Sequence, residues 1–423
     1  MAELYLYLFI LICIALLGWG LARPQRIYQY PFFMGGIFVA FILPQAIALL
    51  NSPYDPVNQK ALERVLLMSC LCAFMCWFGY QLPCKPSLTK KLDISVDSKK
   101  FFYGGIVLVL IAYFSQFLIL QLPSALREQT QWTGIITIYA FFRNLIYPGF
   151  SILLLSTLQR STVFKFILTA FASALPLQLI IFEGRREPTA TFIITLGLCF
   201  YYTLRYIPPR WLVISLIVFT LFAIPLTATY RNIAKTGDWN KLTELQPIEY
   251  LQNYVEKAQI LELRNAALLM DAAVKTRQYG YGTDYWNKLV FSFVPAQLVG
   301  RDLKNSLMIK LYEYDLNRLY NYKIHTGNTT TGIGDSFIQF DYFGCIFFGL
   351  LSYFFKIFWI SSSRRKILTS QIFYISLFAP SMLCVTHGTV NFISDVLFNL
   401  IFIGLIILYS RKKNIQTYSS FSN

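Results

Sequence analysis

The chain has 423 residues, of which 56% are hydrophobic and only 14% are charged. A soluble globular domain has about 25% charged residues, so this composition excludes an ordinary soluble domain and indicates an all-α polytopic membrane protein. The formal net charge of +16 lies mainly in short loops, which indicates membrane topology rather than nucleic-acid binding.

Eleven apolar runs predict eleven transmembrane helices, because a hydrocarbon core of about 30 Å requires about 20 apolar residues. The runs cover about 3–22, 31–50, 62–82, 101–122, 134–158, 163–182, 189–206, 211–229, 336–360, 367–386 and 391–410. The first run lacks the basic start and the cleavage site of a signal peptide, so we expect it to remain as a span. The eight cysteines form no CxxC pair, and no disulfide framework is expected.

Lysine and arginine in alternate short loops predict the orientation. One set of loops holds seventeen such residues and the other holds five. The seventeen are Arg23, Arg26, Lys85, Lys90, Lys91, Lys99, Lys100, Arg160, Lys165, Arg205, Arg210, Arg364, Arg365, Lys366, Arg411, Lys412 and Lys413. The five are Lys60, Arg64, Arg127, Arg185 and Arg186. Since the richer set faces the cytoplasm, we expect the N-terminus outside and the C-terminus inside. Residues 1–229 then hold eight spans, 230–335 a helical extracytoplasmic cap, and 336–423 three spans and a cytoplasmic tail.

Arg143 is a charge within the fifth predicted span. A charge in a span is costly and usually faces the bundle interior or a water-filled cavity. Two interpretations stay open: Arg143 binds substrate, or it pairs with a carboxylate such as Asp395 or Asp341.

The turn between the sixth and seventh spans carries four charges in five residues: Glu183, Arg185, Arg186 and Glu187. Two guanidinium groups can fork onto phosphate oxygens, with the two glutamates orienting them or titrating. This pattern is typical of an anion site. The alternative is a short solvated turn whose arginines reach the membrane surface.

The 230–335 segment is the only long polar stretch. Apolar residues at three- and four-residue spacing predict a helix over 245–276, which we expect to break into two pieces because of its length. It would lie on the membrane surface or roof a cavity. The run Tyr279-Gly-Tyr-Gly-Thr-Asp-Tyr-Trp286 offers aromatic rings either for the membrane interface or for stacking on sugars. The histidines His325 and His387 also fall on this side; without an HExxH pattern they predict no metal site, and each is structural or catalytic.

The same residues resemble the large loop of oligosaccharide repeat-unit (O-antigen) polymerases of the Wzy type. The resemblance rests on the Tyr279–Trp286 run, Phe293-Val-Pro295, the segments 298–304 and 332–344, and the Glu183-Gly-Arg-Arg186 turn, and it covers about half of the chain, from 180 to 360. Ala296 stands where the family often has arginine after the proline, with Arg301 as a substitute. The family's Arg-x10-Gly pattern occurs once, from Arg186 to Gly197, as chance alone would produce.

The resemblance implies a metal-independent glycosyltransferase without cofactors at the outer face of a bacterial inner membrane. Its donor and acceptor would be polyprenyl-diphosphate-linked oligosaccharides, and its partners membrane lipids, a chain-length regulator and a flippase, with no nucleic acid. Such a site needs cations for the diphosphate, a base for the acceptor hydroxyl and a lateral opening for two lipids.

Roles for particular residues follow as hypotheses. The substrate-binding candidates are Arg185, Arg186, Arg264, Arg277, Arg143, Arg231, Tyr281, Trp286, Arg301 and His387. The candidates for the catalytic base are Glu183, Glu187, Asp335 and His325. A carboxylate beside two arginines has a lowered pKa, which favours His325 and Asp335 over the two glutamates of the turn.

Three other functions remain open. A polysaccharide ligase would use a different acceptor, and its loss would leave lipid-linked polymer rather than single repeat units. A transporter or flippase would place charges near the midplane of the membrane and often shows internal repeats, and no such repeat is visible here. A structural envelope protein would use the large loop only to bind partners.

Overall fold

In its computed structural model, the chain is described over residues 1–53, 56–124, 134–243, 245–256, 262–324 and 329–412. These ranges are helical, and they contain a single isolated bridge, between Val96 and Arg411, but no strand. Ten helices in the described part of the chain are long and apolar enough to cross a membrane. The protein is therefore an all-α polytopic membrane protein, as the sequence predicts.

The ten span helices follow the predicted runs closely. They are α1 (Ala2–Ala22), α2–η2–α3 (Tyr30–Asn51), α4 (Gln59–Gln81), α6 (Ser98–Gln121), α8–α9 (Ile135–Gln159), α10 (Val163–Ile181), the first part of α12 (Arg210–Thr236), α19–η4–α20–η5 (Thr331–Arg364), α21 (Leu368–Thr386) and α22 (Thr389–Ser410). The predicted span at 189–206 coincides with α11 (Arg186–Leu204), which packs against α9 and α21 but is not among the ten. Shorter helices at the ends are η1 (Pro24–Tyr28), α5 (Pro86–Lys91) and η3 (Trp239–Leu242).

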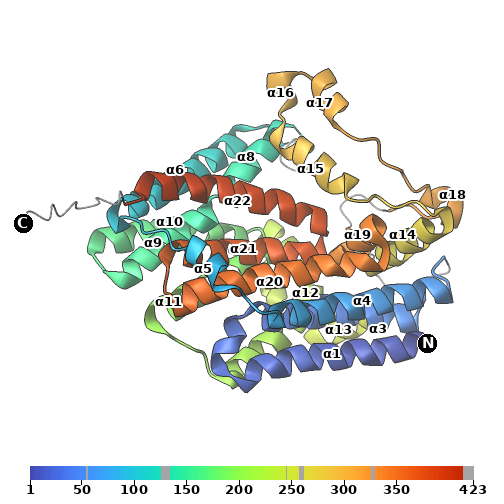
Figure 1. The fold of residues 1–423 in the computed structure, drawn as a ribbon. Helices are drawn as coiled ribbons and strands as arrows, with labels where there is room; N and C mark the ends of the chain where they lie inside the picture. Colours follow the sequence, from blue (N-terminus) through green and yellow to red (C-terminus); the bar gives the residue numbers. More distant parts are fainter. Residues whose placement is uncertain (54–55, 125–133, 244, 257–261, 325–328, 413–423) are drawn as a thin grey trace, which may run out of the picture.

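The start of α1 and the end of α22 lie at opposite ends of the bundle (Figure 1). We call the end that holds Met1, the Glu183–Arg186 turn and the long segment before α19 the loop end. There the N-terminal amino group lies 3.6 Å from the carboxylate of Glu63. The other end is called the tail end, where the backbone N–H of Asp97 donates to the carbonyl of Ser410 over 2.7 Å.

The helix predicted over 245–276 is divided into α13 (Pro247–Glu256) and α14 (Glu262–Thr276), while 257–261 lie outside the described residues. α14 is buried between α4 and α19, and the eleven residues from Leu263 to Ala273 are all buried. The side-chain oxygen of Gln45 accepts from the backbone N–H of Leu263 over 2.9 Å and so caps the start of α14. α14 therefore belongs to the core of the bundle rather than to its surface.

Asp271 fixes α14 to its neighbours at the loop end. Its carboxylate lies 2.9 Å from Arg64 of α4 and 2.8 Å from Lys275, and it accepts from the hydroxyl of Tyr320 over 2.5 Å. Burial acts to raise the pKa of Asp271, but the hydrogen bonds from Lys275, Tyr320 and Arg64 outweigh it, so that the net pKa is lowered. The ionised form therefore stabilises the fold.

Replacing Asp271 with asparagine should destabilise the protein by about 3 kcal/mol, because Arg64 and Lys275 lose their partner while Arg64 stays largely buried. Thermal unfolding in detergent measures this. Since the folded pKa is lowered, the contribution is present above the ordinary aspartate pKa of about 3.9 and is lost as the pH falls further. Asp238→Asn is the control, because its pair with Lys241 is exposed and worth less than about 1 kcal/mol; equal losses in both variants would contradict the assignment.

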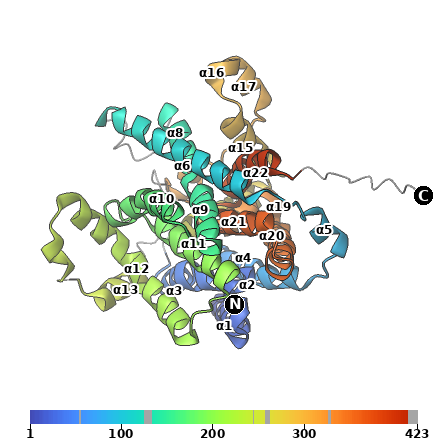
Figure 2. The ribbon, with the colours of Figure 1, turned by 90° about the vertical axis from the view of Figure 1, so that its left-hand side faces the viewer.

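A helical arm projects from the bundle beside α22 (Figures 1 and 2). It consists of α15 (Thr283–Phe293), α16 (Ala296–Val299) and α17 (Arg301–Leu307), and α18 (Leu316–Tyr320) follows it near α14. The indole N–H of Trp286 donates to the carbonyl of Leu307 over 2.8 Å, which holds the arm together. Its outer face exposes large apolar side chains, including Phe291 and Leu303.

Candidate functional site

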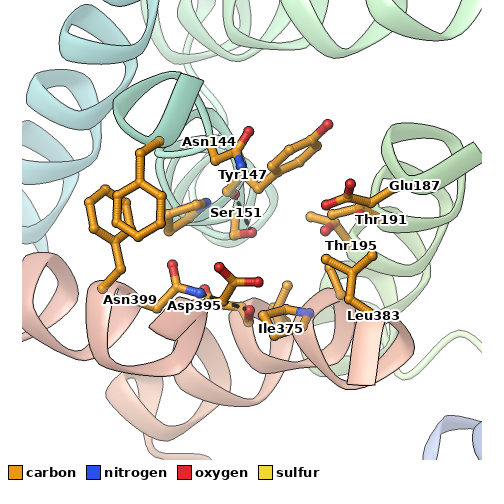
Figure 3. Close-up of a pocket in the computed structure, with 16 residues that line it drawn as sticks. Asn144, Tyr147, Ser151, Glu187, Thr191, Thr195, Ile375, Leu383, Asp395 and Asn399 are labelled. Carbon is orange, nitrogen blue, oxygen red and sulfur yellow. Dashed lines mark hydrogen bonds between the residues drawn. The ribbon is translucent and has the colours of Figure 1, made fainter. Parts of the chain in front are cut away.

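A hollow lies among α8, α9, α11, α21 and α22, near the loop end of the bundle (Figure 3). Its cavity volume is about 50 Å³, room for a few water molecules. Polar side chains line much of it although it is surrounded by membrane-spanning helices. They are Asn144, Tyr147, Ser151, Glu187, Thr191, Thr195, Ser376, Asp395 and Asn399.

A proline in one of these helices explains part of this polarity. Pro380 lies inside α21 and lines the hollow. Because proline has no backbone N–H, it leaves the carbonyl four residues earlier, that of Ser376, without its helical partner. The side-chain amide of Asn399 in α22 donates to that carbonyl over 3.3 Å. Pro148 of α9 also lines the hollow.

Two carboxylates point into the hollow from opposite sides, Glu187 from α11 and Asp395 from α22 (Figure 3). Burial raises the pKa of Glu187, although the charges of Arg143 and Arg185 act to lower it. The direction for Glu187 is opposite to the expectation that flanking arginines lower its pKa: although the residue is partly open to solvent, the loss of hydration outweighs the attraction. Asp395 interacts electrostatically with Glu187 and with Lys288 of α15.

Arg143 ends α8 beside this hollow and is 6% exposed. It donates to the side-chain oxygen of Gln116 over 3.4 Å, and its charge interacts with Arg185, Glu183 and Glu187. Of its two suggested partners, Asp395 lines the same hollow. Asp341 lies at the junction of α19 and η4, close to Tyr279 and Tyr342.

The charged turn is docked on the end of α12. Gly184 has a φ of +57°, and a Cβ at this position would lie 2.7 Å from the ring of Tyr230. The hydroxyl of Tyr230 donates to the carbonyl of Ile181 over 2.8 Å, and Nε of Arg231 donates to the carbonyl of Gly184 over 3.1 Å. These contacts position the turn and argue against a freely solvated loop.

Further cations gather at this turn. Arg185 lies 2.6 Å from the carboxylate of Glu183. Burial lowers the pKa of Arg231, and the charges of Arg186 and Arg185 lower it further, so the three guanidinium groups are close enough to repel one another. Such a group of like charges is stabilised by binding an anion.

His387 joins this cluster from the end of α21. Its Nδ1 lies 2.7 Å from the hydroxyl of Thr386. The ring is accessible to solvent but surrounded by protein, and burial lowers its pKa, as does the charge of Arg186. His387 is therefore mainly neutral at pH 7 and free to accept a proton.

Asp335 lies on the other side of Gly388. Its carboxylate accepts from the hydroxyl of Thr389 over 2.5 Å and from the backbone N–H of Val390 over 3.0 Å, so it caps the N-terminus of α22. Gly388 has a φ of +124°, and a Cβ there would lie 3.3 Å from the same carboxylate. The carboxylate of Asp335 therefore stabilises the start of α22, and Asp335 is not among the residues that line the hollow.

The remaining candidates are dispersed. Arg264 is buried within α14; Arg277 and Tyr281 are exposed just after it. Trp286 and Arg301 belong to the projecting arm. His325 lies outside the described residues. Of the aromatic run, Tyr285 is stacked between Phe340 and Phe347 within the protein, whereas Tyr281 is 75% exposed and available to a ligand.

The structure therefore unites Glu183, Arg185, Arg186, Glu187, Arg143, Arg231 and His387. Sequence reasoning did not assign Asp395 a site role, and it overlooked Asn399, Thr191 and Ser376. A signal was present, because Asp395 and Asn399, like Thr191 and Thr195, are four residues apart and share one helix face. Polar residues at helical spacing within apolar runs predict an interior cavity.

Chemically, the arrangement combines a group of arginines, two carboxylates facing each other and a neutral histidine. Among the described residues, no group of three or more histidine, cysteine or acidic side chains is placed to hold a metal ion. No protein-family model matches the chain, and no curated protein or solved structure resembles it at a significant level.

Proposed function

We propose that this protein is a glycosyltransferase that joins polyprenyl-diphosphate-linked oligosaccharide repeat units at the outer face of a bacterial inner membrane. The observation that carries the proposal is the group formed by Arg185, Arg186 and Arg231, which lies next in sequence to Glu187. Glu187 and Asp395 line one hollow at this end of the bundle. The resemblance of its loop segments to repeat-unit polymerases adds the class of substrate.

Each part of the cluster has a role in this reaction. The guanidinium groups bind the diphosphate of the donor and stabilise the negative charge that develops as it leaves, commonly the largest catalytic term. A carboxylate or the neutral His387 accepts the proton of the attacking sugar hydroxyl. No nucleotide is required, because the sugar–diphosphate bond is already activated.

The outer surface of the molecule suits a lipid-linked substrate. The span part of α12 has no buried residues, so this helix stands at the edge of the bundle (Figure 2). The arm carries apolar side chains together with Lys288, Arg301 and Lys304, a composition typical of the membrane interface. α11 acts as the eleventh span in this proposal, and the loop end faces outward.

Reporter fusions test this orientation. A periplasmic reporter such as alkaline phosphatase should be active when fused at Gly280 and inactive when fused at Ser410, because the set of short loops with seventeen lysines and arginines is expected to face the cytoplasm. A fusion at Arg160, also at the tail end, serves as the matched control for Ser410. Activity at Ser410 and not at Gly280 would overturn the orientation and, with it, the outer-face reaction.

The proposed function itself is tested in a deletion strain, with the lipid-linked glycans sized by mass spectrometry. A polymerase mutant accumulates single repeat units on the lipid, and expression of the intact gene restores long chains. Accumulation of full-length lipid-linked polymer would identify a ligase instead.

One observation favours a lipid-linked oligosaccharide transporter as a second candidate. The polar lining continues from Glu187 to Thr195, which is about 12 Å along α11, so the hollow enters the bundle as a transport path would. Vesicles holding the purified protein distinguish the two: a transporter moves lipid-linked units between leaflets without lengthening them, whereas a polymerase lengthens them without moving them.

A further inference from the structure

The hollow holds polar groups that the arginine site does not use. The hydroxyls of Thr191 and Ser376 line it without a hydrogen-bond partner, and these residues are only 5% and 8% exposed. A buried hydroxyl without a partner is costly. A polar molecule bound in the hollow would supply the missing hydrogen bonds.

Thr191 lies in a helix and therefore has a possible acceptor for its hydroxyl nearby. A threonine within a helix commonly donates to the carbonyl four residues earlier. Thr189, two residues before Thr191 on the same helix, does so, donating to the carbonyl of Arg185 over 2.8 Å. Thr191 lines the hollow and makes no such bond.

The chemistry of the lining selects the ligand. Two facing carboxylates repel a phosphate group, so the diphosphate belongs at the arginines rather than inside the hollow. Hydroxyls, an amide and carboxylates beside the rings of Tyr147 and Phe398 suit a neutral polyol. A partly open hollow of about 50 Å³ is small, so we expect it to take the hydroxyl edge of a sugar rather than its whole ring.

We propose that the hollow is the acceptor subsite, in which Asp395 and Glu187 form the proton-accepting pair and Thr191 and Ser376 hold the reacting sugar edge. This assignment rests on the proposed glycosyltransferase function. It adds Asp395 as a catalytic residue, and it gives Glu187 a partner from a different helix.

The step balances without a further reactant. The acceptor hydroxyl oxygen forms a bond to the anomeric carbon of the donor sugar, and its proton passes to the carboxylate of Asp395. The bond from the anomeric carbon to the diphosphate oxygen breaks, and the lipid diphosphate leaves with the electron pair. Arg185 and Arg186 then hold this anion.

The charged groups around Asp395 and Glu187 support different roles for these two carboxylates. Asp395 faces Glu187 and Lys288, and Glu187 also meets the charges of Arg143 and Arg185. Because two carboxylates at one hollow disfavour each other's ionised form, the negative charge of Glu187 makes Asp395 a better proton acceptor. Asp395, with fewer cations around it, is the better acceptor of the two.

The test uses purified full-length protein in lipid nanodiscs and lipid-linked single repeat units extracted from the deletion strain. Asp395→Asn should lower kcat for chain extension at least about 100-fold, as loss of a general base does, with KM within threefold of the wild type. Asp395→Glu should recover part of kcat. The double variant Thr191→Val with Ser376→Ala should raise KM about tenfold and change kcat less.

Rates are expressed per folded protein, and Asp93→Asn, an exposed residue paired with Arg365 at the tail end, is the control for lost charge. If the wild type extends the units and Asp395→Asn does so within threefold, the base assignment is wrong while the proposed function stands. If the wild type extends nothing although the units are intact, both proposals are overturned together.

Discussion

Replacing Arg186 with alanine should abolish long glycan chains and leave single repeat units on the lipid carrier. Arg186 begins α11, and its charge acts on both Arg231 and His387. Its side chain is exposed, so the substitution removes a ligand for the diphosphate without opening the core. Loss of one group that stabilises the leaving anion costs about 100- to 1,000-fold in rate. Glycans sized by mass spectrometry in a complemented deletion strain measure the effect.

Two variants sharpen this experiment. Arg186→Lys keeps the charge but not the forked donors, and should retain part of the chain length. Arg160→Ala, an exposed arginine at the tail end, should leave the chains unchanged because it is remote from the hollow. Full-length glycan in the Arg186→Ala strain, at normal protein level, would show that the arginine group does not bind the donor.

The helices were predictable because each apolar run has one dominant physical cause, the thickness of the bilayer. The predicted span at 391–410 and α22 (Thr389–Ser410) differ by two residues at the start. The division of the 245–276 helix also followed from its length. Its burial did not follow, because the mixed sequence of α14 is typical of a surface helix. The periodicity does not show that two other helices satisfy its polar groups: Gln45 accepts from the backbone N–H of Leu263, and Arg64 donates to Asp271.

The site was predictable only in part. The turn at Glu183–Arg186 is local in sequence, and its density of charge identified it. Arg231 and His387 join it from helices that are distant in sequence, and no single-chain pattern specifies that contact. Asp335 shows another gap: the sequence does not reveal that its carboxylate accepts from the backbone N–H of Val390 at the N-terminus of α22, and its role as a base stays a prediction.

A second large effect is expected where α4 meets α20. A Cβ added to Gly79 would lie 2.0 Å from the backbone carbonyl oxygen of Gly349. Backbone atoms in packed helices cannot yield locally, so Gly79→Ala must move the two helices apart. Overpacking of this kind costs about 1–3 kcal/mol, and Gly79→Val should cost more. The melting temperature in a single detergent measures the loss.

The facing glycine supplies the matched control. A Cβ at Gly349 would lie 2.5 Å from Cε of Met75, the far end of a flexible side chain that can rotate away. Both substitutions gain about 1 kcal/mol of helix propensity, so the difference between them isolates the backbone contact. We expect Gly349→Ala to melt within about 2 °C of the wild type and Gly79→Ala to melt clearly lower. Equal melting temperatures would mean that α4 and α20 are farther apart than described, and the bundle that frames the hollow would then be packed differently.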